Sequence, residues 1–119
     1  AGLAGRRRAA LAAEALLADE ARDLDAALAE LRARDVLRAL YGKMAEVRAA
    51  EVQRALRRLH GDAREREVLE GLADSLVNKL LAAPTAALKR YARARDAAAV
   101  RRAAELLGVE PDAVADSSA

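Results

Sequence analysis

Apolar and polar residues alternate along the chain with the period of an α-helix. Over residues 5–33, leucine and alanine recur at spacings of four, three, four and three, which is typical of a helix with one apolar stripe. The positions of this stripe are Leu17, Ala21, Leu24, Leu28 and Leu31. The pattern predicts one long helix with one side covered by something else.

Residues 36–60 predict a second helix, whose apolar stripe changes face along its length. The positions in its first half are Val36, Leu37, Leu40, Met44 and Val47. In its second half the stripe lies on a different face, at Val52, Leu56 and Leu59. We predict that Asp35 caps the start of this helix, although nothing at residues 33–35 forbids a continuous one. The two faces indicate different packing partners for the two halves.

A third helix is predicted over residues 63–82, after a turn at Gly61. Asp62 and Glu65 have the spacing of a capping box, in which each side chain accepts a free N–H of the first turn. The apolar positions cover about half of the helix circumference. They are Val68, Leu69, Leu72, Leu76, Val77, Leu80 and Leu81. A stripe of this width predicts that the helix packs against more than one neighbour.

The rest of the chain predicts two shorter helices. Pro84 is expected to end the third helix, and Thr85 to cap a short fourth one. Asp96 is expected to cap a fifth helix that ends at Gly108, and residues 112–119 to form a frayed tail. The predicted fold is therefore all-α, a helical bundle in which a long N-terminal helix is followed by shorter packed helices.

The composition supports this fold class and narrows the chemistry. The chain is 54% hydrophobic but has no Phe or Trp, and a core of Ala, Leu and Val favours closely packed helices. The absence of cysteine excludes disulfides, thiolate metal sites and thiol nucleophiles, and suits a cytoplasmic protein. The net charge of +2 is too small to indicate a nucleic-acid binder. No apolar run approaches the ~20 residues that a membrane span needs.

Residues 76–89 resemble a known family signature. They read Leu-Val-Asn-Lys-Leu-Leu-Ala-Ala-Pro-Thr-Ala-Ala-Leu-Lys. This is similar to Leu-Val-Asn-Lys-Leu-Leu-His-x-Pro-Thr-x-x-Leu-Lys in the C-terminal dimerisation domain of glutamyl-tRNA reductase. Residues 14–20 and 46–48 are similar to further motifs of that domain. Ala82 stands where the signature has His, so any role of that side chain is missing here.

The resemblance implies a function for the larger protein. Glutamyl-tRNA reductases reduce glutamyl-tRNA to glutamate-1-semialdehyde with NADPH, at the entry to tetrapyrrole (porphyrin) biosynthesis. The family places its cysteine nucleophile and its NADPH site in other domains, so we expect no catalytic, cofactor-binding or metal-binding residue in this chain. Residues 1–34 would be the end of the long connecting (spinal) helix, and residues 35–111 the domain that joins two subunits as a homodimer.

Two sets of residues are candidates for this role. The candidate dimer interface comprises Leu69, Leu72, Leu76 and Leu80, with Leu37, Leu40 and Met44. The candidate signature turn comprises Asn78, Lys79, Pro84 and Thr85. The apolar set has an alternative reading as the core of one chain, and its width suggests both. For Asn78 and Lys79 the alternative is an exposed helix face.

Two other function classes remain open. Arg57, Arg58, Arg64 and Arg66 gather around Gly61 in the sequence, and Lys89, Arg90, Arg93, Arg95, Arg101 and Arg102 form a second basic group. Either group is a candidate for contact with tRNA phosphates, but the interleaved acids and the lack of stacking aromatics favour solvated helix faces. His60, the one histidine, has no partner at metal-ligand spacing and is interpreted as structural. The other class is an unrelated helical adaptor.

Overall fold

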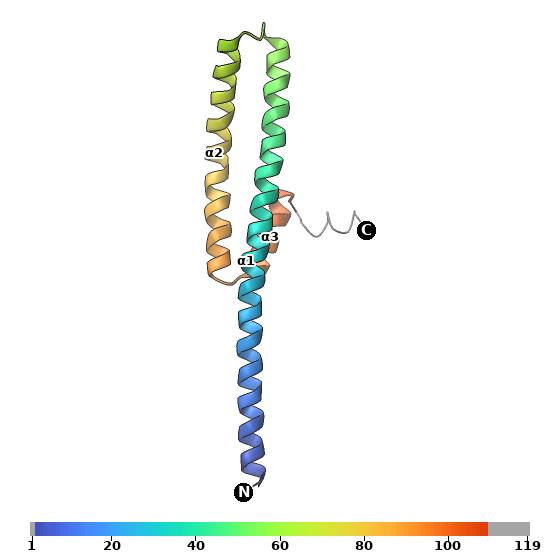
Figure 1. Cartoon of the computed structure of the whole chain (residues 1–119), viewed down its shortest axis with the longest axis vertical. Helices are drawn as coiled ribbons and strands as arrows, with labels where there is room; N and C mark the ends of the chain where they lie inside the picture. Colours follow the sequence, from blue (N-terminus) through green and yellow to red (C-terminus); the bar gives the residue numbers. More distant parts are fainter. Residues whose placement is uncertain (1, 110–119) are drawn as a thin grey trace, which may run out of the picture.

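The computed structural model describes residues 2–109, which form three helices and no strand. Helix α1 spans Gly2–Arg58, α2 spans Ala63–Arg93 and α3 spans Ala97–Leu107. Helices α1 and α2 form an antiparallel hairpin, and α3 packs beside its lower half (Figure 1). The predicted all-α fold with a long first helix is confirmed. The predicted tail at 112–119 lies outside the described residues.

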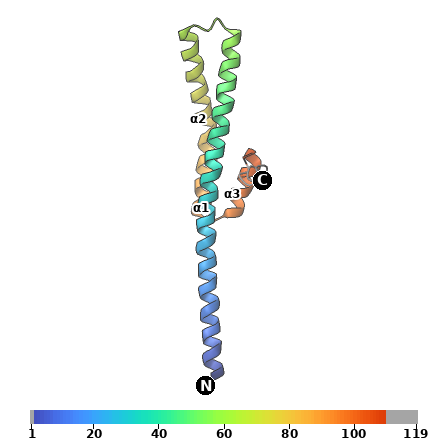
Figure 2. The same ribbon diagram turned by 45° about the vertical axis from the view of Figure 1, so that its right-hand side comes forward.

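The molecule is elongated, with extents of 89 × 31 × 19 Å. The N-terminal half of α1 extends beyond the hairpin as a single helix, and two views at 45° agree that no other element of the described chain lies beside it (Figures 1 and 2). All side chains from residue 2 to residue 25 are exposed. We call this part of α1, residues 2–25, the stalk. The predicted cover for the apolar stripe of the stalk is not supplied by the described part of the chain.

Helix α1 continues without a break through residues 33–35, so the predicted cap at Asp35 is wrong. Asp35 lies in mid-helix with an exposed side chain. Its neighbours Ala33 and Val36 are buried, at 4% and 2% exposure, against the other two helices. Because packing of an apolar face stabilises a helix more than one unfavourable residue destabilises it, the local capping signal is overridden.

Helix α2 continues through Pro84, so the predicted end of the helix at this residue is also wrong. Proline removes one backbone donor and disfavours the helix interior, but Leu81 and Leu88 anchor the helix on both sides of it. Both leucines are buried in the same core, at 5% and 0% exposure. Thr85 does not cap a new helix, and its hydroxyl instead shares a hydrogen bond of 3.1 Å with the hydroxyl of Tyr41 on α1.

The other predicted turns are confirmed. Gly61 adopts a left-handed φ of +71°, which favours glycine. The Asp62 carboxylate accepts the Glu65 N–H at 2.8 Å, and the Glu65 carboxylate accepts the Gly61 N–H at 3.1 Å. Asp96 accepts a first-turn N–H of α3, and Gly108 follows that helix with a φ of +69°. These short-range signals fix where the hairpin turns and where α3 begins and ends.

The core lies where all three helices meet, beside the lower half of α2. Its buried members are Ala33, Val36, Leu40, Leu81, Leu88, Val100, Ala104 and Val109. Lys43 of α1 reaches the C-terminal end of α3, where its ammonium donates to the Leu107 carbonyl at 3.3 Å. A cation at this end of a helix is favourable because the last carbonyl groups carry partial negative charge. This hydrogen bond helps to hold α3 against α1.

Alanine substitution of the two aspartates predicted as caps should affect stability differently. Asp96→Ala should lower the free energy of unfolding by about 1 kcal/mol, because a first-turn N–H of α3 loses its acceptor. Asp35→Ala should cost nothing, because Asp35 makes no hydrogen bond or ion pair with the rest of the described chain and alanine favours a helix interior. Urea denaturation followed by circular dichroism compares them, and equal losses would contradict a continuous α1.

Candidate functional site

A row of apolar side chains on α2 faces solvent. Val68, Leu72, Leu76 and Leu80 follow one another at intervals of four residues, and their exposed fractions are 64%, 55%, 52% and 68%. Residues four apart lie on the same side of a helix, so these side chains form one continuous row. We call these four residues the outer stripe. A contiguous exposed apolar surface of this kind makes the outer stripe a candidate interaction site.

The opposite side of α2 is occupied by α1 of the same chain. Leu72 and Leu81 are about two and a half helical turns apart, so they point in opposite directions. Leu81 is buried in the core. Arg48 of α1 donates to the Asp74 carboxylate at 2.7 Å, which further fixes this side of α2 against α1. The wide apolar pattern of α2 therefore covers two sides of the helix. One side is buried inside the subunit and the other is exposed to solvent.

Helix α3 is too short to cover the whole hairpin. Its Val100 and Ala104 pack only on the lower core. In the upper half of the hairpin, the buried α1 side chains are Val52 and Leu56, which are 7% and 8% exposed. Figure 2 shows this upper half as two helices with no third one beside them. A two-helix layer buries one side of each helix, which leaves a place for further helices on the other side.

The predicted interface residues divide between surface and core. Leu72, Leu76 and Leu80 are exposed, and Leu69 is half-buried. Leu40 is 2% exposed and lies in the core, and Leu37 and Met44 are half-buried against that core. The structure therefore does not present these last three as open surface, because α2 and α3 of the same chain cover that part of α1.

Val68 belongs to the outer stripe although it was not among the candidate interface residues. The signal was present in the sequence, because Val68 lies four residues before Leu72. Val68 is 64% exposed, so it extends the exposed apolar row by one turn toward the start of α2.

The signature residues lie on two different sides of α2. Asn78 and Thr85 line a groove between α1 and α2, together with Tyr41. Lys79 is exposed and lies seven residues after Leu72, so it borders the outer stripe. Pro84 is half-buried inside α2. The signature therefore combines a polar face toward the groove with a cation beside the outer stripe.

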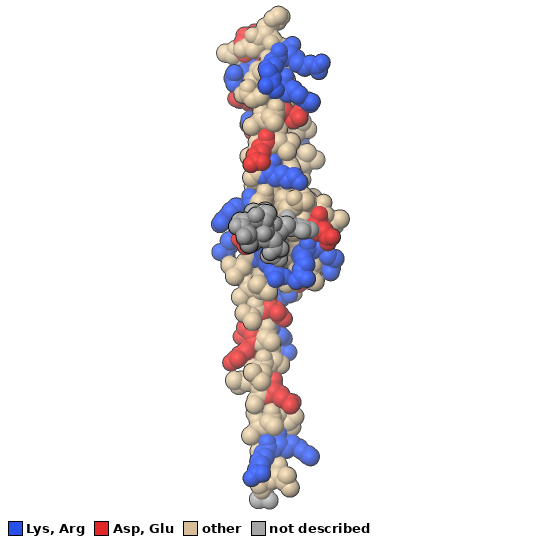
Figure 3. Space-filling view, turned by 90° about the vertical axis from the view of Figure 1, so that its right-hand side faces the viewer, with Lys and Arg blue, Asp and Glu red and all other residues tan. Residues whose placement is uncertain are grey.

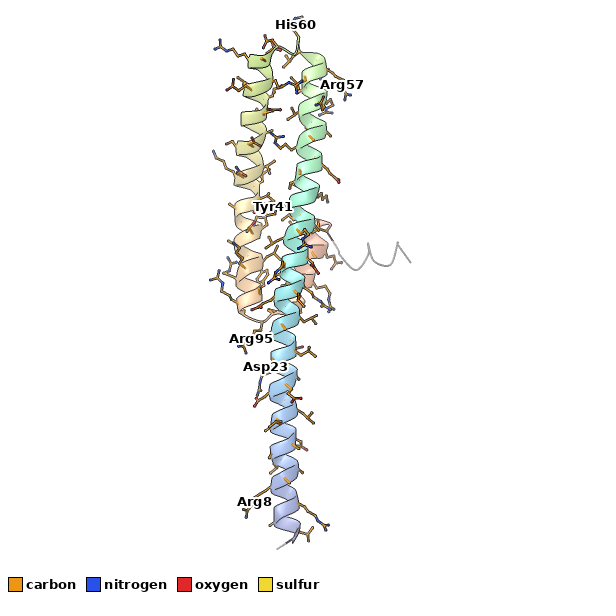
Figure 4. The ribbon with its side chains drawn as sticks, viewed as in Figure 1. Arg8, Asp23, Tyr41, Arg57, His60 and Arg95 are labelled. Atoms are coloured by element: carbon orange, nitrogen blue, oxygen red, sulfur yellow. The ribbon has the colours of Figure 1, made fainter. Side chains whose placement is uncertain are left out.

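The first arginine group gathers at the tip of the hairpin. Arg57 and Arg58 end α1, and Arg64 and Arg66 lie in the first turn of α2, all with exposed side chains. Basic side chains are visible at this end of the molecule in Figure 3, and Figure 4 labels Arg57 near the end of α1 and His60 in the turn above it. His60 is exposed. The four arginines, which are neighbours in the sequence, therefore lie on both sides of the turn at one end of the molecule.

Within residues 2–109, no three His, Cys, Asp or Glu side chains lie close enough together to hold a metal ion. None of the described helices is both long enough and apolar enough to cross a membrane.

Comparison with known proteins identifies the family. The family model of the glutamyl-tRNAGlu reductase dimerisation domain matches residues 12–109, which is most of the chain. No curated protein and no solved structure matches. The match includes the hairpin, the outer stripe and residues 76–89, and it confirms the resemblance that those residues carry. The chain therefore belongs to the family of glutamyl-tRNA reductase dimerisation domains.

Proposed function

We propose that this chain joins two subunits of a glutamyl-tRNA reductase as a homodimer, and that the outer stripe forms the centre of the interface. The observation that carries this proposal is the row of four large apolar side chains, each more than half exposed, on the side of α2 that faces away from its own chain. Burying a leucine from water is worth about 1.5–3 kcal/mol.

A second copy of the chain is a suitable occupant of this surface. In a two-fold dimer the same patch meets itself, so it must be complementary to its own shape. A row of side chains at intervals of four residues forms the ridge that packs into the grooves of another such helix. Two copies of α2, related by a two-fold axis near Leu72–Leu76, would bury both rows at once. The family name supports the same role.

The chemistry would take place in other parts of the protein. The proposed reaction is the NADPH-dependent reduction of glutamyl-tRNA to glutamate-1-semialdehyde, in the cytoplasm, as the first step of porphyrin biosynthesis. The present chain has no cysteine to serve as the nucleophile and no Gly-x-Gly-x-x-Gly loop for a dinucleotide. Its contribution would be to hold the two subunits together while the other domains bind substrate and cofactor.

A single-cysteine variant tests which surface pairs. Because the chain has no native cysteine, Leu76→Cys introduces the only thiol. Mild oxidation should give a disulfide-linked dimer rapidly, because the two copies of residue 76 would face each other near the axis. Leu106→Cys is the control, since Leu106 is 88% exposed on α3, away from the outer stripe. Faster cross-linking at residue 106 than at residue 76 would contradict the proposal.

A second candidate function is contact with tRNA at the hairpin tip. It is favoured by the four exposed arginines that the turn brings together. If these residues bind phosphates, replacing Arg57, Arg58, Arg64 and Arg66 by glutamine should weaken tRNA binding in a gel-shift assay and reduce its dependence on salt concentration. Glutamine at Arg6, Arg7, Arg8 and Arg22 of the stalk is the control, because it removes the same four charges. Equal effects from the two variants would show that only the overall charge matters.

A further inference from the structure

A groove between α1 and α2 has the chemistry of an anion site. Its volume is about 490 Å³, and its polar lining comes from Tyr41, Asn78, Thr85, Lys89, Arg90 and Arg93. This volume lies in the range of small-molecule sites, about 300–1,000 Å³. We propose that the groove binds a small phosphate-bearing anion, a role separate from subunit pairing.

The charges that line the groove are all positive. Lys89, Arg90 and Arg93 stand along one helix face, and no carboxylate is among the lining residues. The ion pairs in the described part of the chain use Arg22, Arg48 and Arg54, and none of them neutralises these three cations. Cations that converge on a concave surface raise the local concentration of anions. Arginine and lysine both form strong charge-assisted hydrogen bonds with phosphate.

Neutral donors complete the site. The hydroxyls of Tyr41 and Thr85 are 3.1 Å apart, so one donates to the other. The hydroxyl that accepts still has its own hydrogen to donate outward. The side-chain amide of Asn78 adds further donors. A phosphate group offers several acceptor oxygens, so it can accept from cationic and neutral donors together.

Ala82 lines the groove with only a methyl group, so it leaves space between the polar side chains on either side of it. Asn78, Ala82, Thr85 and Lys89 follow one another at intervals of four, three and four residues, so they form one line along α2. All four line the groove. A larger side chain at position 82 would take up part of this space, which makes Ala82→His a test of the site.

The site is separate from the proposed dimer contact. None of the four outer-stripe residues lines the groove. Substitutions in the groove can therefore remove anion binding while the outer stripe is unchanged, and the two roles can be tested independently.

The experiment is a titration of the ¹⁵N-labelled chain with inorganic phosphate and pyrophosphate, with ionic strength held constant by sodium chloride. We expect saturable shifts of the Thr85, Ala86 and Lys89 amide signals. Ala82→His should weaken binding about tenfold or more, because the larger side chain occupies the groove. The double variant Lys89→Gln with Arg93→Gln should weaken it by a similar factor, because two charged donors are lost. The control is Arg57→Gln with Arg58→Gln, which removes the same charge at the tip and should leave binding unchanged.

Three results would overturn the anion site. They are shifts that never saturate, an equal loss of binding in the control variant, and binding of a short RNA through these residues without binding of pyrophosphate. The mass of each variant, measured in the same samples, distinguishes this proposal from the proposed dimer. An Ala82→His chain that keeps the mass of the unaltered chain but loses phosphate binding supports the site.

Discussion

Replacing Leu72 and Leu76 together by glutamate should convert the proposed dimer into monomers. Each subunit would lose two apolar side chains from the interface, and each leucine is worth about 1.5–3 kcal/mol when buried. Bringing four carboxylates into an apolar contact adds a further penalty. The dissociation constant should therefore rise at least about a thousandfold. The helices themselves should persist, since neither residue belongs to the core of the subunit.

Sedimentation velocity measures this change, with circular dichroism as the check on helix content. The matched control is Leu106→Glu, which places the same charge at an exposed leucine of α3. It should leave the dimer intact. A double variant that stays dimeric, or a control that dissociates as readily, would place the interface elsewhere than the outer stripe.

Leu88→Ala should be the most destabilising single substitution within the subunit. Leu88 is 0% exposed and lies between all three helices, where its loss leaves a cavity. Such truncations cost about 2–5 kcal/mol, a large share of the about 5–15 kcal/mol by which domains are stable. Because Leu88 also anchors α2 on the C-terminal side of Pro84, we expect the helix to loosen there.

Urea denaturation at one fixed protein concentration gives the comparison, since dimer formation adds a concentration-dependent contribution to stability. Leu106→Ala is the control, because the same atoms are removed from a side chain that is 88% exposed. The control should change the free energy of unfolding by no more than about 0.5 kcal/mol. Similar losses in both variants would mean that the core has been placed wrongly.

Local signals in the sequence were sufficient to predict the helix type and most turns. Gly61, Asp62 and Glu65 predict the hairpin turn because their effects act within a few residues. Asp96 and Gly108 do the same for α3. At these positions no long-range packing opposes the local preference, so the prediction and the structure agree.

The two wrong boundaries arise where distant packing prevails. Asp35 and Pro84 are ordinary signals for the start or end of a helix. In the structure, Val36 and Leu81 lie beside them and are buried against other helices. The free energy of that burial depends on residues that are far away in the sequence, so no local pattern reveals it.

The candidate interface was only partly predictable, because it too depends on packing between residues that are far apart in the sequence. The width of the α2 stripe predicts more than one neighbour, and α2 does contact both α1 and α3, but part of the stripe remains exposed. The pattern does not tell which leucines α3 will cover, since that depends on how the chain returns after Arg93. Leu40 and Leu76 have the same periodicity in the sequence, but the first is 2% exposed and the second 52%.

Sedimentation equilibrium of the unaltered chain tests the central claim most directly. The chain has a mass of 12.6 kDa, and it should sediment with twice that mass over a roughly hundredfold range of concentration, with dissociation only at the dilute end. A mass of 12.6 kDa at every concentration would contradict the account, because the outer stripe would then remain in water with no second copy to cover it.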